Sequence, residues 1–277
     1  MSRLHPICLP FVAAWLLLAT GPAPQATAGL TEVIVNGGFE TGNLSGWTRA
    51  EQAGSNGSFM VTGAASTPLS GLPTPGPASG SFYAVSDQDP GSPLLAAQAL
   101  FQTIVVPQGS SSVLLSFEMF VNDPSGSLDP NGNPGIVDPS GLDYTSGGTG
   151  NPNQHARVDI LSVGSDPLTT GAGVLRNFYL GVDPSTQPAP SSSPYTSYGF
   201  DVTDLIGGGG TFILRFAEVN NQGPLNVGVD NVSVLARSSA VPEPASWAIL
   251  SLGGFALAAY GMLNSRRPIQ DSVVLQG

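Results

Sequence analysis

The sequence predicts an all-β protein whose main domain, residues 29–240, folds as a jelly-roll β-sandwich. Apolar and polar residues alternate along short segments of this region, as they do in half-buried strands. Clusters of Gly, Pro, Ser, Asn and Asp separate the segments and mark turns. No segment of the region repeats its apolar residues every 3.6 positions, as an amphipathic helix would. About ten short strands divided by turns are typical of a sandwich or jelly roll.

The alternation is longest over residues 113–121, where every second residue is a large apolar one. Period two over nine residues predicts a strand with one face in the core. Shorter segments of the same kind predict further strands at Val33–Val35, Phe82–Val85, Phe101–Val106, Val158–Leu161, Val174–Leu180, Tyr198–Val202, Phe212–Phe216 and Val227–Leu235.

Two stretches contain too few apolar residues to enter a core, namely Ala64–Gly80 and the long polar loop 122–154. A loop as long as the second is usually functional or disordered. Residues 129–133 begin with the Asp-x-Asn-x-Asn spacing of a calcium-binding EF-hand loop. Pro134 then replaces the required glycine, and Ser140 stands in place of the bidentate glutamate. We therefore interpret this loop as mobile surface with weak affinity for cations at most.

The C-terminal segment, residues 241–277, has the pattern of a membrane anchor. Ala245–Leu263 carries no charge and would span roughly 28 Å as a helix, close to the ~30 Å hydrocarbon core of a bilayer. Arg266 and Arg267 follow, and arginines at this position mark the cytoplasmic side. Residues before Val241 are therefore expected outside the membrane, and residues 268–277 in the cytoplasm.

A proline-acid-proline triplet, Pro242, Glu243 and Pro244, precedes this helix. With the helix and the arginines it resembles the PEP-CTERM sorting signal of Gram-negative bacteria, here over residues 241–267. The resemblance implies an exosortase as processing partner, and delivery from the inner membrane to the cell surface or extracellular polysaccharide matrix. Residues 268–277 depart from the family, whose members usually stop soon after the arginines. A plain anchor therefore remains the alternative.

The N-terminal residues 1–28 have the pattern of a secretory signal peptide. Arg3 precedes an apolar run, Ile7–Ala19, that Pro10 interrupts, and Ala26-Thr27-Ala28 is a small-residue cleavage site. We expect cleavage after Ala28 and export of the domain. A retained N-terminal anchor is the alternative.

The predicted ectodomain is strongly acidic, with 17 Asp and Glu against five arginines and no lysine. Such a surface repels nucleic acid and anionic lipid, and it suits divalent cations or neutral glycans. Solubility outside the cell would also explain the charge.

The ectodomain lacks most side chains that enzymes use as nucleophiles and bases. Cys8 and His5 lie in the signal peptide, which leaves His155 as the sole histidine and no thiol. Cys–His dyads, multi-histidine zinc sites and lysine Schiff bases are therefore excluded. No Gly-x-Ser-x-Gly motif is present to pair a serine with His155. We predict that the protein is not an enzyme.

The two ends of the domain carry its most specific pattern. Asn36–Glu40 with Leu44–Trp47 opens it, and 229–234 closes it as Val-Asp-Asn-Val-Ser-Val. Strand alternation places Asp230 on the same inward face as Val232 and Val234. A buried carboxylate needs a metal ion or a charged partner to offset its loss of hydration. Arg157 and Arg215 are the arginines available as partners.

These end segments resemble the first and last strands of galactose-binding-like jelly rolls, a group with many carbohydrate-binding modules. In several members the corresponding acids hold a structural calcium between the first and last strands. The resemblance implies Glu40 and Asp230 as calcium ligands. It covers the two ends of the domain and does not name a glycan.

Sugar binding requires exposed aromatic faces. Trp47, Tyr195 and Tyr198 are our candidates, and the tyrosines follow a Ser- and Pro-rich stretch that favours exposure. Trp47 after a turn glycine is also typical of a core residue. The remaining aromatic candidates are Tyr83, Tyr144 and Tyr179.

Three functions remain open. The leading hypothesis is a non-catalytic, exported surface or matrix protein whose jelly roll binds a glycan such as an exopolysaccharide. The second is a polysaccharide-acting hydrolase that uses a carboxylate pair on the same scaffold. The third is a purely structural envelope protein.

Overall fold

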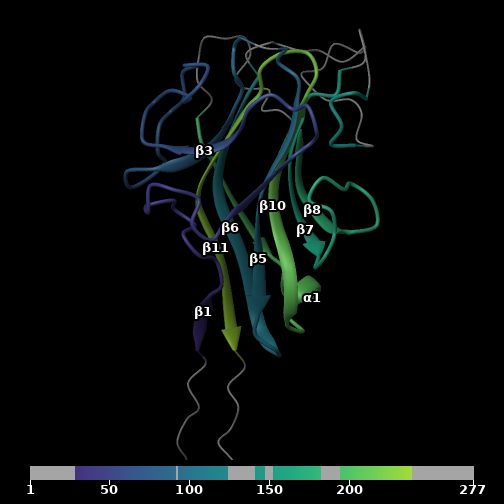
Figure 1. Ribbon diagram of the computed structural model, residues 1–277. Helices are drawn as coiled ribbons and strands as arrows, with labels where there is room; N and C mark the ends of the chain where they lie inside the picture. The colour runs from purple at the N-terminus through teal and green to yellow at the C-terminus, as the bar shows by residue number, and fades with distance from the viewer. Residues whose placement is uncertain (1–28, 92, 124–140, 147–151, 182–193, 239–277) are drawn as a thin grey trace, which may run out of the picture. The chain divides into compact units, whose positions relative to one another are not determined.

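Two antiparallel β-sheets pack face to face as an all-β sandwich (Figure 1). The computed structural model describes residues 29–91, 93–123, 141–146, 152–181 and 194–238. The predicted signal peptide, the sorting segment and most of the predicted long loop lie outside these ranges. Among the described residues, no helix is long and apolar enough to cross a membrane.

The six-stranded sheet has the order β3-β4-β11-β6-β9, with β1 also paired to β11. The central pair, β6 and β11, runs antiparallel from Asn122↔Asn226 to Ser110↔Ser238. The strands are β1 (Leu30–Glu32), β3 (Ser58–Thr62), β4 (Tyr83–Asp87), β6 (Ser110–Asn122), β9 (Thr196–Asp201) and β11 (Asn226–Ser238).

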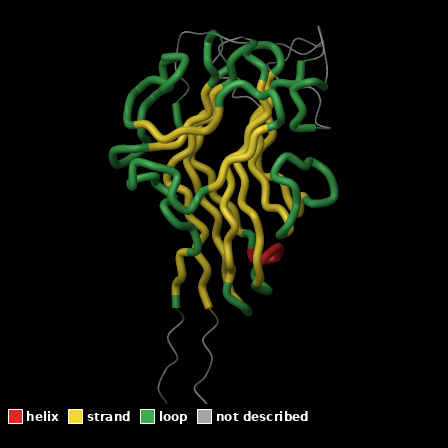
Figure 2. The backbone as a smooth tube through the Cα atoms, viewed as in Figure 1, coloured by secondary structure: helices red, strands yellow, loops and turns green. Residues whose placement is uncertain are grey.

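The five-stranded sheet has the order β2-β5-β10-β7-β8, so β2 and β3 are edge strands of the two sheets. Its strands are β2 (Thr48–Glu51), β5 (Ala96–Val106), β7 (His155–Ser162), β8 (Val174–Gly181) and β10 (Gly210–Asn220). One short helix, α1 (Thr203–Ile206), follows β9 (Figure 2).

The core fills the space between the sheets with alternate residues of each strand. On β6 the predicted set from Val113 to Val121 points inward and is buried, as the period-two pattern requires. Phe117 contacts Phe216 of β10 across the core, with ring centroids 5.2 Å apart. Burying a side chain of this size contributes about 1.5–3 kcal/mol. The core that stabilises the sandwich is therefore formed mainly by the alternate apolar residues of its strands.

The strand predicted at Val33–Val35 is wrong, because the strand assigned there, β1, ends at Glu32. Val33 still donates to Val234 O, but the next backbone groups bond to side chains. Ile34 N donates to Glu32 Oε1 at 2.8 Å, and Val35 exchanges two bonds with the Gln102 side chain. The chain leaves the sheet here because side chains take over its backbone hydrogen bonds.

The two ends of the domain lie side by side. Gly29 N donates to Ser238 Oγ at 3.1 Å, and Ser238 N donates to Gly29 O at 3.0 Å. Figure 1 shows β1 and β11 reaching the same end of the sandwich, while many of the longer loops gather at the other. We call this second region the loop end.

Candidate functional site

A β-bulge in β11 decides where the Asp230 side chain lies. The ladder with β6 shifts register after Asp230, and Asn231 has φ 50°, a region in which Asn is enriched. Val229 and Val232 both lie in the core, so Asp230 lies on the outer face of the six-stranded sheet. The predicted inward face shared by Asp230, Val232 and Val234 is therefore wrong, because the bulge changes the phase of the strand.

Asp230 is nevertheless fully buried, because the loop of residues 78–82 covers it. Its Oδ2 accepts Ala78 N at 2.9 Å and Ser79 N at 3.2 Å, and its Oδ1 accepts Asn231 N at 2.7 Å. Burial raises the pKa of Asp230 to about 6, although these backbone N–H groups act in the opposite direction. The carboxylate therefore anchors this loop to the last strand.

Glu40 holds the same loop from the other side. Its Oε1 accepts Ser81 N at 3.0 Å and Phe82 N at 3.1 Å. The segment that carries Glu40 pairs with β11, since Val232 N donates to Gly37 O at 3.0 Å. A Cβ at Gly37 would lie 1.9 Å from Val232 O, so only glycine permits this approach.

The structure thus brings the two predicted calcium ligands, Glu40 and Asp230, to one loop, and gives both carboxylates backbone donors. Across the described part of the chain, no three Asp, Glu, His or Cys side chains gather as a metal site. Carboxylates and nearby carbonyls are the ligands that calcium prefers. The donor chemistry fits calcium in part, and the ion remains a prediction.

The arginines considered as partners of Asp230 bind Asp159 instead. Arg157 donates to both Asp159 oxygens, at 2.8 and 2.7 Å, and Arg215 Nε donates to Oδ2 at 3.1 Å. Burial opposes ionisation, but the hydrogen bonds and charges of the two arginines prevail and hold the pKa of Asp159 below its usual value. Arg215 Nη1 also donates to Pro167 O and Thr169 O. The cluster fixes a loop on the outer face of the five-stranded sheet.

The three aromatic candidates are less exposed than expected. Trp47 is 7% exposed and packs on Phe39 and Phe216, with centroids 5.5 and 6.0 Å away. Tyr198 is half-buried and stacks on Phe117 at 4.9 Å, and Tyr195 is half-buried with an enclosed hydroxyl. The exposure predicted for Tyr195 and Tyr198 is therefore wrong. Trp47 is a core residue whose surface also reaches a pocket.

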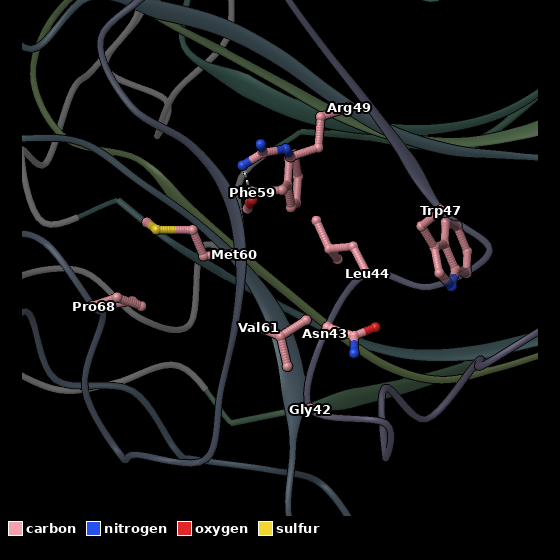
Figure 3. A pocket seen from close by; sticks show the side chains of 9 residues that line it. All are labelled: Gly42, Asn43, Leu44, Trp47, Arg49, Phe59, Met60, Val61 and Pro68. Atoms are coloured by element: carbon pink, nitrogen blue, oxygen red, sulfur yellow. Dashed lines mark hydrogen bonds between the residues drawn. The ribbon is translucent and has the colours of Figure 1, made fainter.

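This pocket, the edge pocket, lies between the edge strands β2 and β3 and has a volume of about 430 Å³ (Figure 3). Figure 3 shows Arg49 on one side, Asn43 on the other and Leu44 between them. The lining residues are Gly42, Asn43, Leu44, Trp47, Arg49, Phe59, Met60, Val61 and Pro68.

Arg49 gives the edge pocket a positive charge and free donors. Its Nη1 donates to Phe59 O at 3.2 Å. Among the described arginines, Arg49 and Arg237 make no ion pair. Sequence reasoning missed Arg49 because β2 reads Thr-Arg-Ala-Glu and has no apolar alternation. The Gly46-Trp47 turn before it was the available signal.

One pair of carboxylates lies on neighbouring strands, as a hydrolase that uses two carboxylates would require. Glu118 of β6 stands directly opposite Asp230 of β11. Asp230 is covered, however, and Glu118 accepts Asn231 Nδ2 at 2.7 Å and Ser197 Oγ at 3.1 Å. His155 is fully buried at the start of β7. Asp230 and His155 are therefore covered, whereas Glu118 is half-buried.

The sorting residues Pro242, Glu243, Pro244, Arg266 and Arg267 lie outside the described ranges.

No protein-family model matches the chain, and no curated protein does. Solved structures of similar fold include TmCBM61 in complex with β-1,4-galactotriose, at 10% identity and TM-score 0.42, covering 75% of this chain and 99% of that one. The K3 cleaved adhesin domain of Lys-gingipain from Porphyromonas gingivalis W83 has 13% identity and TM-score 0.44, covering 76% and 100%. The Stig cyclase Fisc from Fischerella sp. TAU has 18% identity and TM-score 0.39, covering 76% and 100%. Binding domains and an enzyme occur side by side, and at this distance they do not distinguish functions.

Proposed function

We propose that this protein is an exported, non-catalytic surface or matrix protein that binds a polysaccharide through the edge pocket. The observation that carries the proposal is the combination of groups in that pocket. Leu44, Val61 and the accessible surface of Trp47 offer apolar contact to a sugar ring, while Asn43 and Arg49 offer hydrogen bonds to hydroxyls.

The size of the edge pocket supports the same proposal. Ligand pockets usually measure about 300–1,000 Å³, and about 430 Å³ suits one or two sugar units. The pocket lies at an open edge of both sheets, so a polymer can continue beyond the bound unit. The net charge of −11 favours a neutral glycan over an acidic one.

The test is binding of the full chain to an array of neutral bacterial oligosaccharides, followed by calorimetry on the best one. Arg49→Gln removes the charged donor and should weaken binding about tenfold or more. Arg237→Gln removes the other described arginine without an ion pair, and it should leave the affinity unchanged. Equal affinities of Arg49→Gln and the wild type would assign any binding to another surface.

We further propose that the protein is anchored through residues 245–263 and processed at Pro242–Pro244 by an exosortase-type enzyme. Support comes from the motif, the uncharged helix and the two arginines that follow it. The pairing of Gly29 with Ser238 is compatible with this proposal, because it brings both connections to one end of the domain. The proposed destination is the cell surface or extracellular matrix of a Gram-negative bacterium.

A structural calcium ion between Glu40 and Asp230 forms part of the proposal. Its support is that both side chains converge on the loop 78–82 from the first and last segments of the domain. An ion there would strengthen the closure of the sandwich without taking part in sugar binding.

The alternative is a polysaccharide-acting hydrolase that uses Glu118 and Asp230. Their cross-strand pairing and the raised pKa of Asp230 favour it, whereas the complete burial of Asp230 disfavours it. Reducing-sugar release that Glu118→Gln abolishes would establish the hydrolase. If the protein neither releases sugar from any glycan nor binds one, the purely structural function remains.

A further inference from the structure

Polar side chains replace apolar ones at the loop end of the space between the two sheets. On β10, Phe216 faces the core, and Glu218 two residues later faces the same way. Gln98 of β5 stands directly opposite Glu218 in the ladder. Gln88 follows β4 and reaches across from the other sheet to Glu218. Glu218, Gln98 and Gln88 are all fully buried.

In this cluster the glutamine NH2 groups donate hydrogen bonds, but several of the acceptor oxygens receive none. Gln88 Nε2 donates to Glu218 Oε1 at 2.9 Å and to Leu225 O at 3.0 Å. Gln98 Nε2 donates to Asn56 O at 3.1 Å. In the described structure, Gln88 Oε1, Gln98 Oε1 and Glu218 Oε2 accept no hydrogen bond of normal geometry, although the Ser86 hydroxyl lies near Glu218. Three buried oxygens from three strands or strand ends thus have no partner, which is rare in native proteins.

The cluster also contains a carboxyl group, Glu218, whose ionised form has no positive partner among the described residues. Burial raises the pKa of Glu218 well above its usual value, against hydrogen bonding from Ser86 and Gln88, and the nearby charge of Asp87 raises it further. Asp87 is fully buried as well. The described arginines that form ion pairs do so with Asp159 and Asp204. A cation from solution would supply the missing charge.

We propose that a calcium ion binds among Glu218, Gln88 and Gln98, between the two sheets. Calcium takes carboxylate and amide oxygens in flexible geometry, and the unpartnered oxygens of the cluster are of these two kinds. Magnesium fits less well, because it requires a nearly ideal octahedron and usually retains several waters. This site lies on the inner faces of the sheets and is distinct from that of Glu40 and Asp230.

Two other occupants satisfy the cluster less completely. A proton on Glu218 provides one donor, so at least one glutamine oxygen remains without a partner. A water molecule provides two hydrogen-bond donors, but it carries no charge to offset the carboxylate. Calcium is the occupant that both takes carboxylate and amide oxygens and offsets the charge of the carboxylate.

The experiment measures the melting temperature of the full chain in chelator and in increasing calcium. At a hundredfold excess over Kd, we expect calcium to raise it by about 5–10 °C. The melting temperature of Asp230→Asn should still rise with calcium. This result separates the Glu218 site from the site proposed at Glu40 and Asp230. Glu218→Gln, combined with Asp230→Asn, should abolish the response.

A second variant covers the case in which Glu218→Gln fails to fold. Gln98→Glu adds a carboxylate opposite Glu218, so it should lower the melting temperature in chelator and enlarge the gain with calcium. Loss of the calcium response in Asp230→Asn alone would overturn the proposal, as would a response that survives in the double variant. If calcium leaves the melting temperature of the wild type unchanged and Glu218→Gln melts higher than the wild type, Glu218 is protonated in the fold and no ion binds there.

Discussion

Asp159 shows how one buried carboxylate can hold two arginines. Its two oxygens accept hydrogen bonds from Arg157, Arg215 and Asn177 Nδ2, and the side chains of Asp159 and Arg215 are fully buried. Arg215 also fixes the adjacent loop, because its Nη1 donates hydrogen bonds to Pro167 O and Thr169 O. Removing one partner of such a cluster leaves a charge buried without compensation, which is more costly than losing the pair.

Asp159→Asn should therefore lower the free energy of unfolding at pH 7 by about 3–5 kcal/mol. The folded-state pKa of Asp159 lies below its unfolded value, so its contribution is present above the unfolded pKa. That contribution is lost as pH falls through the folded pKa. Urea titrations from pH 7 to pH 3 should thus show a shallower acid dependence in the variant.

Asp204→Asn is the control for this prediction. It breaks the exposed Arg176–Asp204 pair, whose side chains are 37% and 68% exposed. Exposed pairs contribute about 0–1 kcal/mol. If Asp159→Asn and the wild type lose stability in parallel as pH falls, the low pKa of Asp159 is not what stabilises the fold in neutral solution.

At the scale of elements, the sequence predicts most strands that have one face in the core, but it misses β3, whose Phe59 is a core residue. The strand at β6 is visible because five alternate residues face that core. β2 is hidden, since Thr48–Glu51 is an edge strand with three exposed residues. The edge pocket could not be predicted for the same reason, because Arg49 lies in that strand. The position of Asp230 depends on the bulge at Asn231, and a single positive φ leaves little signal in sequence.

The loop 78–82 is the element with which the calcium proposal at Glu40 and Asp230 can be tested. Asp230→Asn, made in a Glu218→Gln background, replaces one of the two acceptor oxygens with an NH2 donor. The backbone donors of Ala78, Ser79 and Asn231 can then no longer all be satisfied. The melting temperature in calcium should fall, because charge-assisted hydrogen bonds of this kind contribute about 1.5–3 kcal/mol. Thermal unfolding followed by circular dichroism measures the change.

Chelator provides the second arm of this test. It should lower the melting temperature of the Glu218→Gln parent and have no effect once Asp230 is also replaced. A parent whose melting curve is unchanged by chelator would show that backbone N–H groups alone hold the two carboxylates.

For the whole molecule, the adjacent ends of the described domain determine from which side of the sandwich the chain continues. Gly29 and Ser238 are hydrogen-bonded neighbours, and β1 and β11 lie side by side up to that point. An attachment that follows Ser238 therefore leaves from one end of the sandwich. The loop end is the opposite one (Figure 1). The Glu218 cluster lies at the start of β11, far from Ser238, since Gln88 donates to Leu225 O just before that strand begins.

The sorting proposal is tested in an exosortase-bearing host. Replacing Pro242, Glu243 and Pro244 with alanine should leave a full-length precursor in the inner membrane, because the processing site is lost while the uncharged helix remains. Immunoblots of membrane and surface fractions measure this. If the wild type also stays full-length in the membrane, residues 241–267 act only as a membrane anchor.

The central position of β11 has a mechanical consequence. β11 is hydrogen-bonded along its length to β6 and, over shorter stretches, to β1 and β4. Ladder hydrogen bonds lie perpendicular to the strands, so tension applied at Ser238 along β11 loads many of them at once, in shear. A sandwich pulled from an edge strand by a crosswise force would instead open one bond after another. A tether that continues from β11 thus loads a central strand in the direction in which its ladder hydrogen bonds resist together.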